Sequence, residues 1–542
     1  MQEKNLDLRS RQVGCVPILD RFIGLMELRD KFVEALGNTD YADALIILLK
    51  NILIDRDALY AVKDWAKQFG LVLGRGGEIG DDRLGRALER LFWSDRATLQ
   101  TRIVLAVVKA FDVKMDQIHG DTTSVSFAGS YRNQDARAVQ LKRGHSKDHR
   151  PDLKQLVYSL CVSRDGAVPI HFKTYDGNRT DDTIQWEIWS SIRTLLQTPN
   201  FTFVGDSKLC VSKTLVKIHA EHGLFVTMVP DTRLEVGEFE KEIESGDVRW
   251  ERILRKRSPR CGSEFDTFDC AQGPRQLREG FPLFWYRSSQ KKRRDAEDRK
   301  DRIGRALEKL ENLDLKRMRG PKTEKAMRDR IDACLRRYQV ETWLRVDIKL
   351  EVREQFRAMT RGKPTNETRY RKLVKKVPRL HVQKNADAIA RSQLMDGIFP
   401  LTSNTKEAPV EVLKIYKYQP KIEKRHASLK STLEAAPVWL KKNTRVEALM
   451  FIEWVAQLIA ALIEREIRRE MKTQNINLLA SLPEGRPSET PTFEQLRRLF
   501  ESSQLHELFD KNRPVRSFAS TLSSVQSQIL ALVKVPVSAY GC

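Results

Sequence analysis

The 542-residue sequence has few cysteines and no paired arrangement of them. Its seven cysteines are scattered and none stands in a C-x-x-C pair, which excludes a small disulfide-stabilised scaffold. Cys261 and Cys270 are candidates for a zinc site, but no second pair of ligands follows at the spacing of a zinc finger. We therefore expect reduced thiols in a cytosolic protein.

The sequence also lacks a secretion signal and a long uninterrupted hydrophobic run. The N-terminus MQEKNLDLRSR has no apolar core of the kind that signal peptides carry. The longest apolar run, Ala448–Ile463, contains Glu453 and Gln457 and is shorter than the roughly 20 residues that a bilayer span needs. We expect a buried helix here and no membrane partner.

Positive charge is what the sequence has in excess. The 96 Lys and Arg outnumber the 73 Asp and Glu, for a net charge of +23. Between Arg287 and Arg379 there are 31 Lys and Arg against 15 Asp and Glu, so most of the excess lies there. The run Lys291, Lys292, Arg293 and Arg294 belongs to this segment. The concentration predicts a polyanionic partner, nucleic acid first, whereas a single charge run is also typical of a solvated helical surface.

Hydrophobic periodicity predicts helices followed by a sheet. Apolar residues recur at helical spacing through the first 70 residues and again from 81 to 111. The module at 81–114 suits DNA binding, dimer formation or plain helix packing. From Met115 the pattern becomes extended, and 156–162 with 167–175 form a predicted β-hairpin. Further strands at 201–204 and 224–229, separated by a helix, predict an α/β sheet.

Two aspartates stand at similar positions on predicted strands. Asp121 and Asp206 each follow a glycine within or at the end of a strand, and Glu423 lies on a late helix. Three carboxylates that converge on one sheet edge can hold two Mg²⁺ ions, which activate an attacking oxygen and stabilise a leaving one during phosphodiester cleavage. The alternative is that each aspartate is a turn or cap residue.

The stretch Tyr416–Lys430 places four polar residues on one face of a predicted helix. Tyr416, Gln419, Glu423 and Lys430 are spaced by three, four and seven residues. Lys430 can neutralise phosphate charge, Tyr416 can donate to a phosphate oxygen, and Glu423 can hold a divalent cation. An exposed amphipathic helix with ordinary ion pairs is the alternative.

Taken together, these motifs resemble the DDE transposases of bacterial insertion sequences, most closely the group marked by Y-x2-R-x3-E-x6-K. The likeness covers roughly residues 75 to 470. Gln419 stands where the group has Arg, so the positive charge is missing there. The matching segments are H-G-D-T-T-S at 119–124, G-H-S-K-D-H-R-P-D-L-K-Q at 144–155, D-G-N-R-T-D at 176–181, V-G-D-S-K at 204–208, D-G-I-F-P-L-T-S-N at 396–404 and Y-x2-Q-x3-E-x6-K at 416–430.

The resemblance implies an α/β fold with an RNase H-like catalytic domain. A long basic insertion interrupts that domain, and a helical N-terminal region and a helical C-terminal tail flank it. The boundaries expected are 1–73 for the N-terminal region with a DNA-binding role, 81–114 for the helical module, 115–229 for the first part of the catalytic domain, 230–395 for the insertion, 396–475 for the last part with the Glu-bearing helix, and 476–542 for a tail suited to dimerisation.

The resemblance also implies residue roles. Asp121, Asp206 and Glu423 match the catalytic, metal-binding triad. Tyr416, Gln419 and Lys430 match the phosphate-contacting positions, and we expect the basic run at 291–294 to contact DNA. The cofactor that the resemblance implies is Mg²⁺, with Mn²⁺ as a substitute, at two ions per site.

The function implied is a transposase that cleaves the ends of its own element and joins the 3′-OH ends to target DNA. Its partners would be double-stranded DNA, as terminal inverted repeats and target, and a second copy in a homodimer. The setting would be the bacterial cytoplasm, in association with the nucleoid. Two alternatives stay open, namely a transposase-derived DNA-binding protein without catalysis and an RNase H-like nuclease without strand transfer. The helix 446–471 suits either dimerisation or burial against the sheet.

Overall fold

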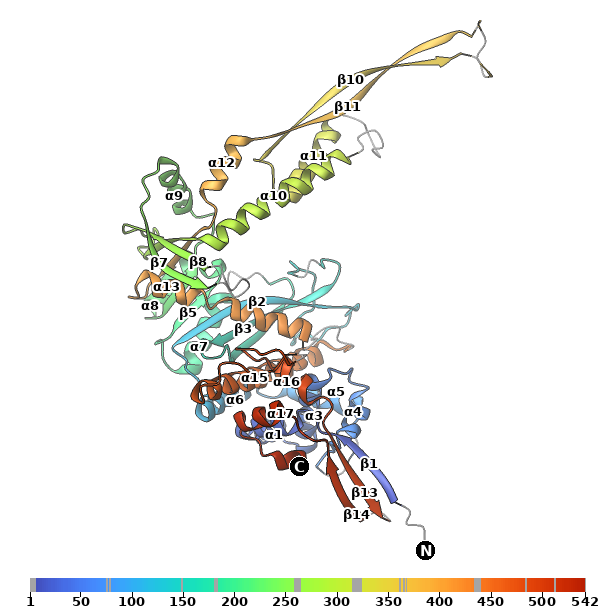
Figure 1. Ribbon diagram of the computed structural model, residues 1–542, viewed down its shortest axis with the longest axis vertical. Coiled ribbons are helices and arrows are strands. Elements are labelled where there is room, and N and C mark those ends of the chain that lie inside the picture. The colour runs from blue at the N-terminus through green and yellow to red at the C-terminus, as the bar shows by residue number, and fades with distance from the viewer. Residues whose placement is uncertain are drawn as a thin grey trace. The chain divides into compact units, whose positions relative to one another are not determined.

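The computed structural model describes residues 6–541 apart from 75, 76, 78, 148, 149, 180–183, 258–264, 314–323, 360, 361, 364, 365, 367, 433–439, 483, 484, 511 and 512. Residue contacts divide the chain into two compact units. The first unit comprises Met1–Met228 and Ser403–Cys542, and the second comprises Val229–Thr402 (Figure 1). The fold is mixed α/β.

The first unit is built on five adjacent strands in the order β4-β3-β2-β5-β6. Strands β2, β3 and β4 are antiparallel neighbours, whereas β5 and β6 run parallel to β2. The predicted hairpin and the two later strands are confirmed. The bounds are β2 Gln117–Phe127, β3 Lys154–Ser163, β4 Pro169–Asp176, β5 Thr202–Gly205 and β6 Leu224–Met228.

Helices join the parallel strands and precede the sheet. Helix α8 (Ser212–Ala220) connects β5 to β6, because parallel neighbours need a crossover connection. Helix α7 (Ile184–Leu196) leads into β5. The helices predicted before the sheet are confirmed as α1 Val16–Leu25, α2 Leu28–Leu36, α3 Thr39–Ile54, α4 Val62–Gln68, α5 Asp81–Trp93 and α6 Arg96–Phe111.

The longest helix, α15 (Asn443–Thr473), forms the centre of the first unit. It is long and apolar enough to cross a bilayer by length and composition, but 94% of its most apolar window is buried inside the protein. It packs against α3, α5 and β4, and Trp454 stacks on Phe172 of β4 with ring centroids 5.3 Å apart. The expectation that this run is a buried helix is confirmed.

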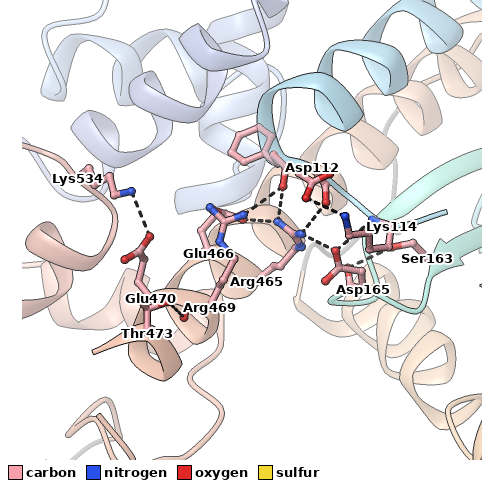
Figure 2. Close-up of polar contacts among 11 residues, drawn as sticks. Asp112, Lys114, Ser163, Asp165, Arg465, Glu466, Arg469, Glu470, Thr473 and Lys534 are labelled. Atoms are coloured by element: carbon pink, nitrogen blue, oxygen red, sulfur yellow. Dashed lines mark hydrogen bonds and ion pairs between the residues drawn. The ribbon is translucent and has the colours of Figure 1, made fainter. Parts of the chain in front are cut away.

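Arg465 ties α15 to its neighbours through buried polar contacts, which Figure 2 shows. Its guanidinium donates to the main-chain oxygens of Phe111 at 2.9 Å and Asp112 at 3.3 Å, where α6 ends. It also pairs with Asp165 in the turn between β3 and β4 and with Glu466. One side chain thus joins α15, α6 and the hairpin turn.

The expectation that the two terminal regions are purely helical is wrong, because both contain β-strands. Strand β1 (Leu6–Gln12) pairs with β13 (Gln504–Asp510), which pairs in turn with β14 (Arg513–Ala519). Helices α16 (Phe493–Phe500) and α17 (Ser524–Leu532) flank this small sheet. A short terminal strand is stabilised by a partner almost 500 residues away, which local periodicity cannot reveal.

The second unit contains the strand order β12-β9-β8-β7, all antiparallel neighbours. Helices α10 and α11 pack on the base of a two-stranded ribbon, β10 and β11, through a core that includes Ile303, Ile331 and Val346. The bounds are α9 Leu234–Ser245, β7 Trp250–Arg257, β8 Phe265–Ala271, β9 Leu283–Ser288, α10 Ser289–Glu311, α11 Glu324–Tyr338, β10 Leu344–Ala358, β11 Tyr370–Lys384, α12 Ala386–Leu394 and β12 Ile398–Ser403.

Candidate carboxylate site

Asp121 lies in the middle of β2, the central strand of the first unit. Its Oδ1 accepts a hydrogen bond from the main-chain N of Thr122 at 2.7 Å and lies 3.8 Å from Lys147 Nζ. Its Oδ2 lies 3.6 Å from His426 Nε2. The side chain is 17% exposed, so it is reachable from solvent while donors surround it.

Gly120 explains why glycine precedes this aspartate. A Cβ atom at Gly120 would lie 2.7 Å from the ring of Phe203, which belongs to the neighbouring strand β5. Real Cβ atoms do not approach that closely, so a larger residue would have to displace the buried ring of Phe203. The glycine therefore allows close packing of the strands that carry the two aspartates.

Asp206 follows β5 directly and begins a short 3₁₀ helix. Its Oδ1 accepts from the main-chain N of Lys208 at 3.1 Å, and its carbonyl oxygen accepts from Thr227 Oγ1 at 2.7 Å. Burial raises the pKa of the Asp206 carboxyl, and the negative charge of Asp121 raises it further. The charge of Asp121 therefore disfavours the ionised form of Asp206.

Glu423 joins this group through helix α14 (Pro420–Ala427). Tyr416 is the last residue of the preceding helix, α13 (Pro409–Tyr416). Burial raises the pKa of the Tyr416 phenol, and the charges of Asp206, Glu423 and Asp121, in that order, raise it further. The phenol therefore stays protonated at neutral pH, and the charges of all three acids of the predicted triad reach it.

The predicted continuous helix from Tyr416 to Lys430 is wrong. Helix α13 ends at Tyr416 and α14 begins at Pro420. Lys430 lies in Ser428–Thr432, which is a π-helix. Proline has no main-chain N–H and restricts the residue before it, so it suits the first position of a new helix. The three polar residues up to Glu423 therefore come from two helices and their junction.

Gln419 is buried at that junction, with 6% of its surface exposed. Its Oε1 accepts from His119 Nδ1 at 2.8 Å, and its Nε2 donates to the carbonyl oxygen of Gly120 at 3.2 Å. Gln117 Nε2 lies 2.7 Å from the other ring nitrogen of His119, which assigns the His119 proton to Nδ1. The amide thus links α14 to β2 beside Asp121.

Two residues near Asp121 were not predicted from the sequence. Lys147 donates from Nζ to the carbonyl oxygen of Thr122, and its main-chain N donates to Ser124 Oγ at 3.0 Å. His426 is 6% exposed, and neither of its ring nitrogens has a hydrogen-bond partner among the described residues. Burial, with Lys147 and Lys430 nearby, lowers the pKa of His426 to about 3. The spacing of three residues between Glu423 and His426 was the available signal.

Arg425 holds α14 against the rest of the first unit. It donates to the main-chain oxygens of Ala167 at 3.0 Å and Gly166 at 3.1 Å, and it pairs with Glu464 of α15 at 2.9 Å. Both charged side chains are 10% exposed. This anchoring gives the helix that carries Glu423 a defined position relative to β3, β4 and α15.

The ligand chemistry of the carboxylates suits a hard divalent cation, although the side chains are not gathered around one point. Within the described part of the chain, no group of three or more His, Cys, Asp or Glu side chains is arranged to hold a metal ion. Carboxylate oxygens are the ligands that Mg²⁺ prefers. The repulsion that raises the pKa of Asp206 would be relieved by a cation between the acids. The donor set therefore fits Mg²⁺ if the side chains close around it.

The remaining predicted positions lie elsewhere or outside the described residues. The run Lys291–Arg294 begins α10 in the second unit, where Lys291 pairs with Asp295 at 2.5 Å. Asp396 pairs with the buried Arg299 at 2.6 Å, also in the second unit. Parts of the matched motifs and of the zinc prediction fall on residues that are not described, namely Asp148, His149, Thr180, Asp181 and Cys261.

Comparisons with known proteins give distant structural likenesses. No protein-family model matches the chain, and no curated protein matches it. Among solved structures, the chain is similar to the piggyBac transposase in a synaptic complex with hairpin DNA, with 13% identity and a TM-score of 0.27. The likeness covers 50% of this chain and 60% of the piggyBac chain.

Proposed function

We propose that this chain is a DNA transposase that cleaves the ends of its own element and joins the 3′-OH ends to target DNA. The observation that carries the proposal is that Asp121 lies on β2, Asp206 directly follows the neighbouring strand β5, and Glu423 lies on α14, whose N-cap residue Gln419 bonds to Gly120 of β2. The strand order and directions of the first unit support an RNase H-like catalytic domain. The match to the Y-x2-R-x3-E-x6-K pattern supports the transposase reading over other phosphodiester chemistry.

In this proposal the three carboxylates hold two Mg²⁺ ions. Bound Mg²⁺ would supply the charge that activates an attacking oxygen and stabilises a leaving one. Tyr416, kept protonated by its surroundings, donates a hydrogen bond to a phosphate oxygen, and Lys430 neutralises phosphate charge. Lys147 offsets the charge of Asp121 from 3.8 Å. Gln419, because its amide bonds to His119 and Gly120, orients α14 against β2.

The proposal extends to partners and setting. Double-stranded DNA, as element ends and as target, is the substrate, and the basic run at 291–294 contributes to holding it. A homodimer would bring two DNA ends together in a bacterial cytoplasm, in association with the nucleoid. Two alternatives predict different outcomes in the same assay, namely a DNA-binding protein without catalysis and a nuclease without strand transfer.

The test is cleavage of a DNA duplex that carries the gene's own flanking ends, with Mg²⁺ or Mn²⁺. We expect metal-dependent nicking at the ends by the native protein, no nicking by Asp121→Asn or Glu423→Gln, and unchanged DNA binding by both variants, because only the cation ligands are lost. Glu411→Gln is the matched control, since Glu411 lies on α13 and pairs only locally with Lys414 at 2.6 Å in the described contacts.

Three outcomes separate the alternatives. Full cleavage by Glu423→Gln would contradict the triad. Tight binding without cleavage under either metal would favour the DNA-binding protein. Cleavage whose 3′ ends are never joined to a second DNA would favour the nuclease.

A further inference from the structure

The ribbon of β10 and β11 has two chemically different faces. The strands pair in register from Leu344 opposite Lys384 to Ala358 opposite Tyr370. Side chains alternate between the two faces of a strand, so the odd-numbered residues of both strands share one face and the even-numbered residues share the other. Together the two strands carry ten Lys and Arg against three Asp and Glu.

The odd-numbered face carries positive charges that oppose one another. The register places Arg357 directly opposite Arg371 and Lys349 directly opposite Arg379. Like charges directly opposite each other destabilise an antiparallel pair. All four residues are exposed, and the Glu351 carboxylate on this face is engaged by Arg379 at 2.9 Å. Such an arrangement is favourable when a polyanion lies against it.

The even-numbered face is apolar, and α10 and α11 cover only its base. Leu344 and Val346 are buried in the core between the ribbon and these helices. Further out, Val352, Phe356 and Val374 are 59%, 62% and 57% exposed, where the ribbon extends past the helices (Figure 1). Two of the charged residues on this face, Glu354 and Lys372, pair with each other at 2.5 Å. The even-numbered residues of the two strands include three Lys against one Glu, whereas the odd-numbered residues include seven Lys and Arg against two Asp and Glu, so the odd-numbered face carries most of the net charge.

We propose that the odd-numbered face of the β10–β11 ribbon is a docking surface for double-stranded DNA. The choice of DNA as the polyanion rests on the proposed function, whereas the surface itself follows from the ribbon. Its 15-residue strands span about 50 Å, more than one turn of B-DNA at roughly 34 Å. A two-stranded ribbon fits the major groove of B-DNA, whereas the major groove of A-form RNA is too narrow for protein side chains to read.

The experiment compares two triple variants of the full chain in binding to a 30-base-pair DNA duplex. Lys349→Gln, Arg357→Gln and Arg371→Gln together remove charges from the odd-numbered face and relieve the like-charge pairs. Val352→Thr, Phe356→Thr and Val374→Thr together alter the other face of the same strands and keep β-branched residues. Circular dichroism checks that both variants fold.

We expect the charge variant to bind roughly 10²-fold more weakly at 0.1 M salt, with the slope of log K against log salt concentration reduced by about two to three. The apolar-face variant should bind within about threefold of the native protein, since phosphate contacts dominate this affinity. An RNA duplex of equal length should respond less to the charge variant than DNA does.

The results distinguish this inference from the proposed function. An unchanged affinity and slope in the charge variant would overturn the inference even if the native protein cleaves DNA. A loss of binding confined to the apolar-face variant would overturn it too and would assign the contact to the other face. A native protein that never cleaves, but whose DNA binding responds to the charge variant as expected, would leave the inference standing and overturn the enzymatic function.

Discussion

At the scale of residues, Gln419 has a different role in the fold from the one that its place in the motif suggests. The motif made it a candidate phosphate contact, yet its amide is buried and bonded to His119 and Gly120. The bonds hold the junction of α13 and α14 against the strand that carries Asp121. An arginine at this position would bring a charge into a buried site where the neutral amide now makes hydrogen bonds through both its oxygen and its nitrogen.

We predict that Gln419→Leu lowers the free energy of unfolding by about 1–3 kcal/mol, because it leaves a buried imidazole N–H and a buried carbonyl without partners. Urea unfolding of the purified protein measures this difference. Gln474→Leu is the control, since Gln474 is an exposed residue at the end of α15. Equal stability of the two variants would contradict the structural role of Gln419.

At the scale of elements, α15 organises the first unit through both its apolar surface and a few buried charges. Arg465 reaches the end of α6 and the β3–β4 turn (Figure 2), while Arg425 on α14 reaches Glu464, the residue before Arg465 on α15. Buried charges are costly unless they are paired. The elements that position Glu423 therefore depend on α15 through specific polar contacts.

We predict that Arg465→Met destabilises the protein by about 3–5 kcal/mol, because it leaves Asp165 and Glu466 without their buried partner. Lys534→Ala should cost no more than about 1 kcal/mol, since Lys534 is 62% exposed and pairs with Glu470 at 3.1 Å near the surface. Chemical denaturation of both variants gives the comparison. A similar, small loss for each would mean that the Arg465 contacts add little to stability.

At the scale of the whole molecule, the stability of the protein should fall at mildly acidic pH, because a buried histidine resists protonation in the folded state. His171 of β4 is 9% exposed, and burial, with the nearby charge of Lys173, lowers its pKa to about 4. In the unfolded chain a histidine takes up a proton as pH falls below about 6.5. The unfolded state therefore binds more protons than the folded state between about pH 6.5 and 4, and stability falls as pH falls through that window.

We predict that His171→Phe removes up to about 1.4 kcal/mol per pH unit from this dependence, the maximum for one titrating group. Urea unfolding at pH 7, 6 and 5 measures the slope. His145→Phe is the control, because His145 is exposed in the same unit. A slope that stays the same in His171→Phe would show that other groups govern the acid response.

The secondary structure was largely predictable where its signal is local. The helices before residue 111, the hairpin of β3 and β4, and the buried helix α15 follow from periodicity and turn residues. The strands β1, β13 and β14 were missed because their stability comes from partners distant in sequence. Pro420 was a local indication that a new helix begins at α14. Its effect on the backbone outweighed the helical spacing of Tyr416, Gln419 and Glu423.

The amino-acid sequence contained the three acids, their order and the excess of positive charge, because these are properties of composition and spacing. How near these acids come to one another is decided by the fold alone, since they lie on elements up to 302 residues apart in the chain. Folding also buried Gln419, placed His426 and Lys147 next to Asp121, and aligned like charges across the β10–β11 ribbon. Each of these depends on which strands and helices become neighbours, and that is set by packing across the whole fold.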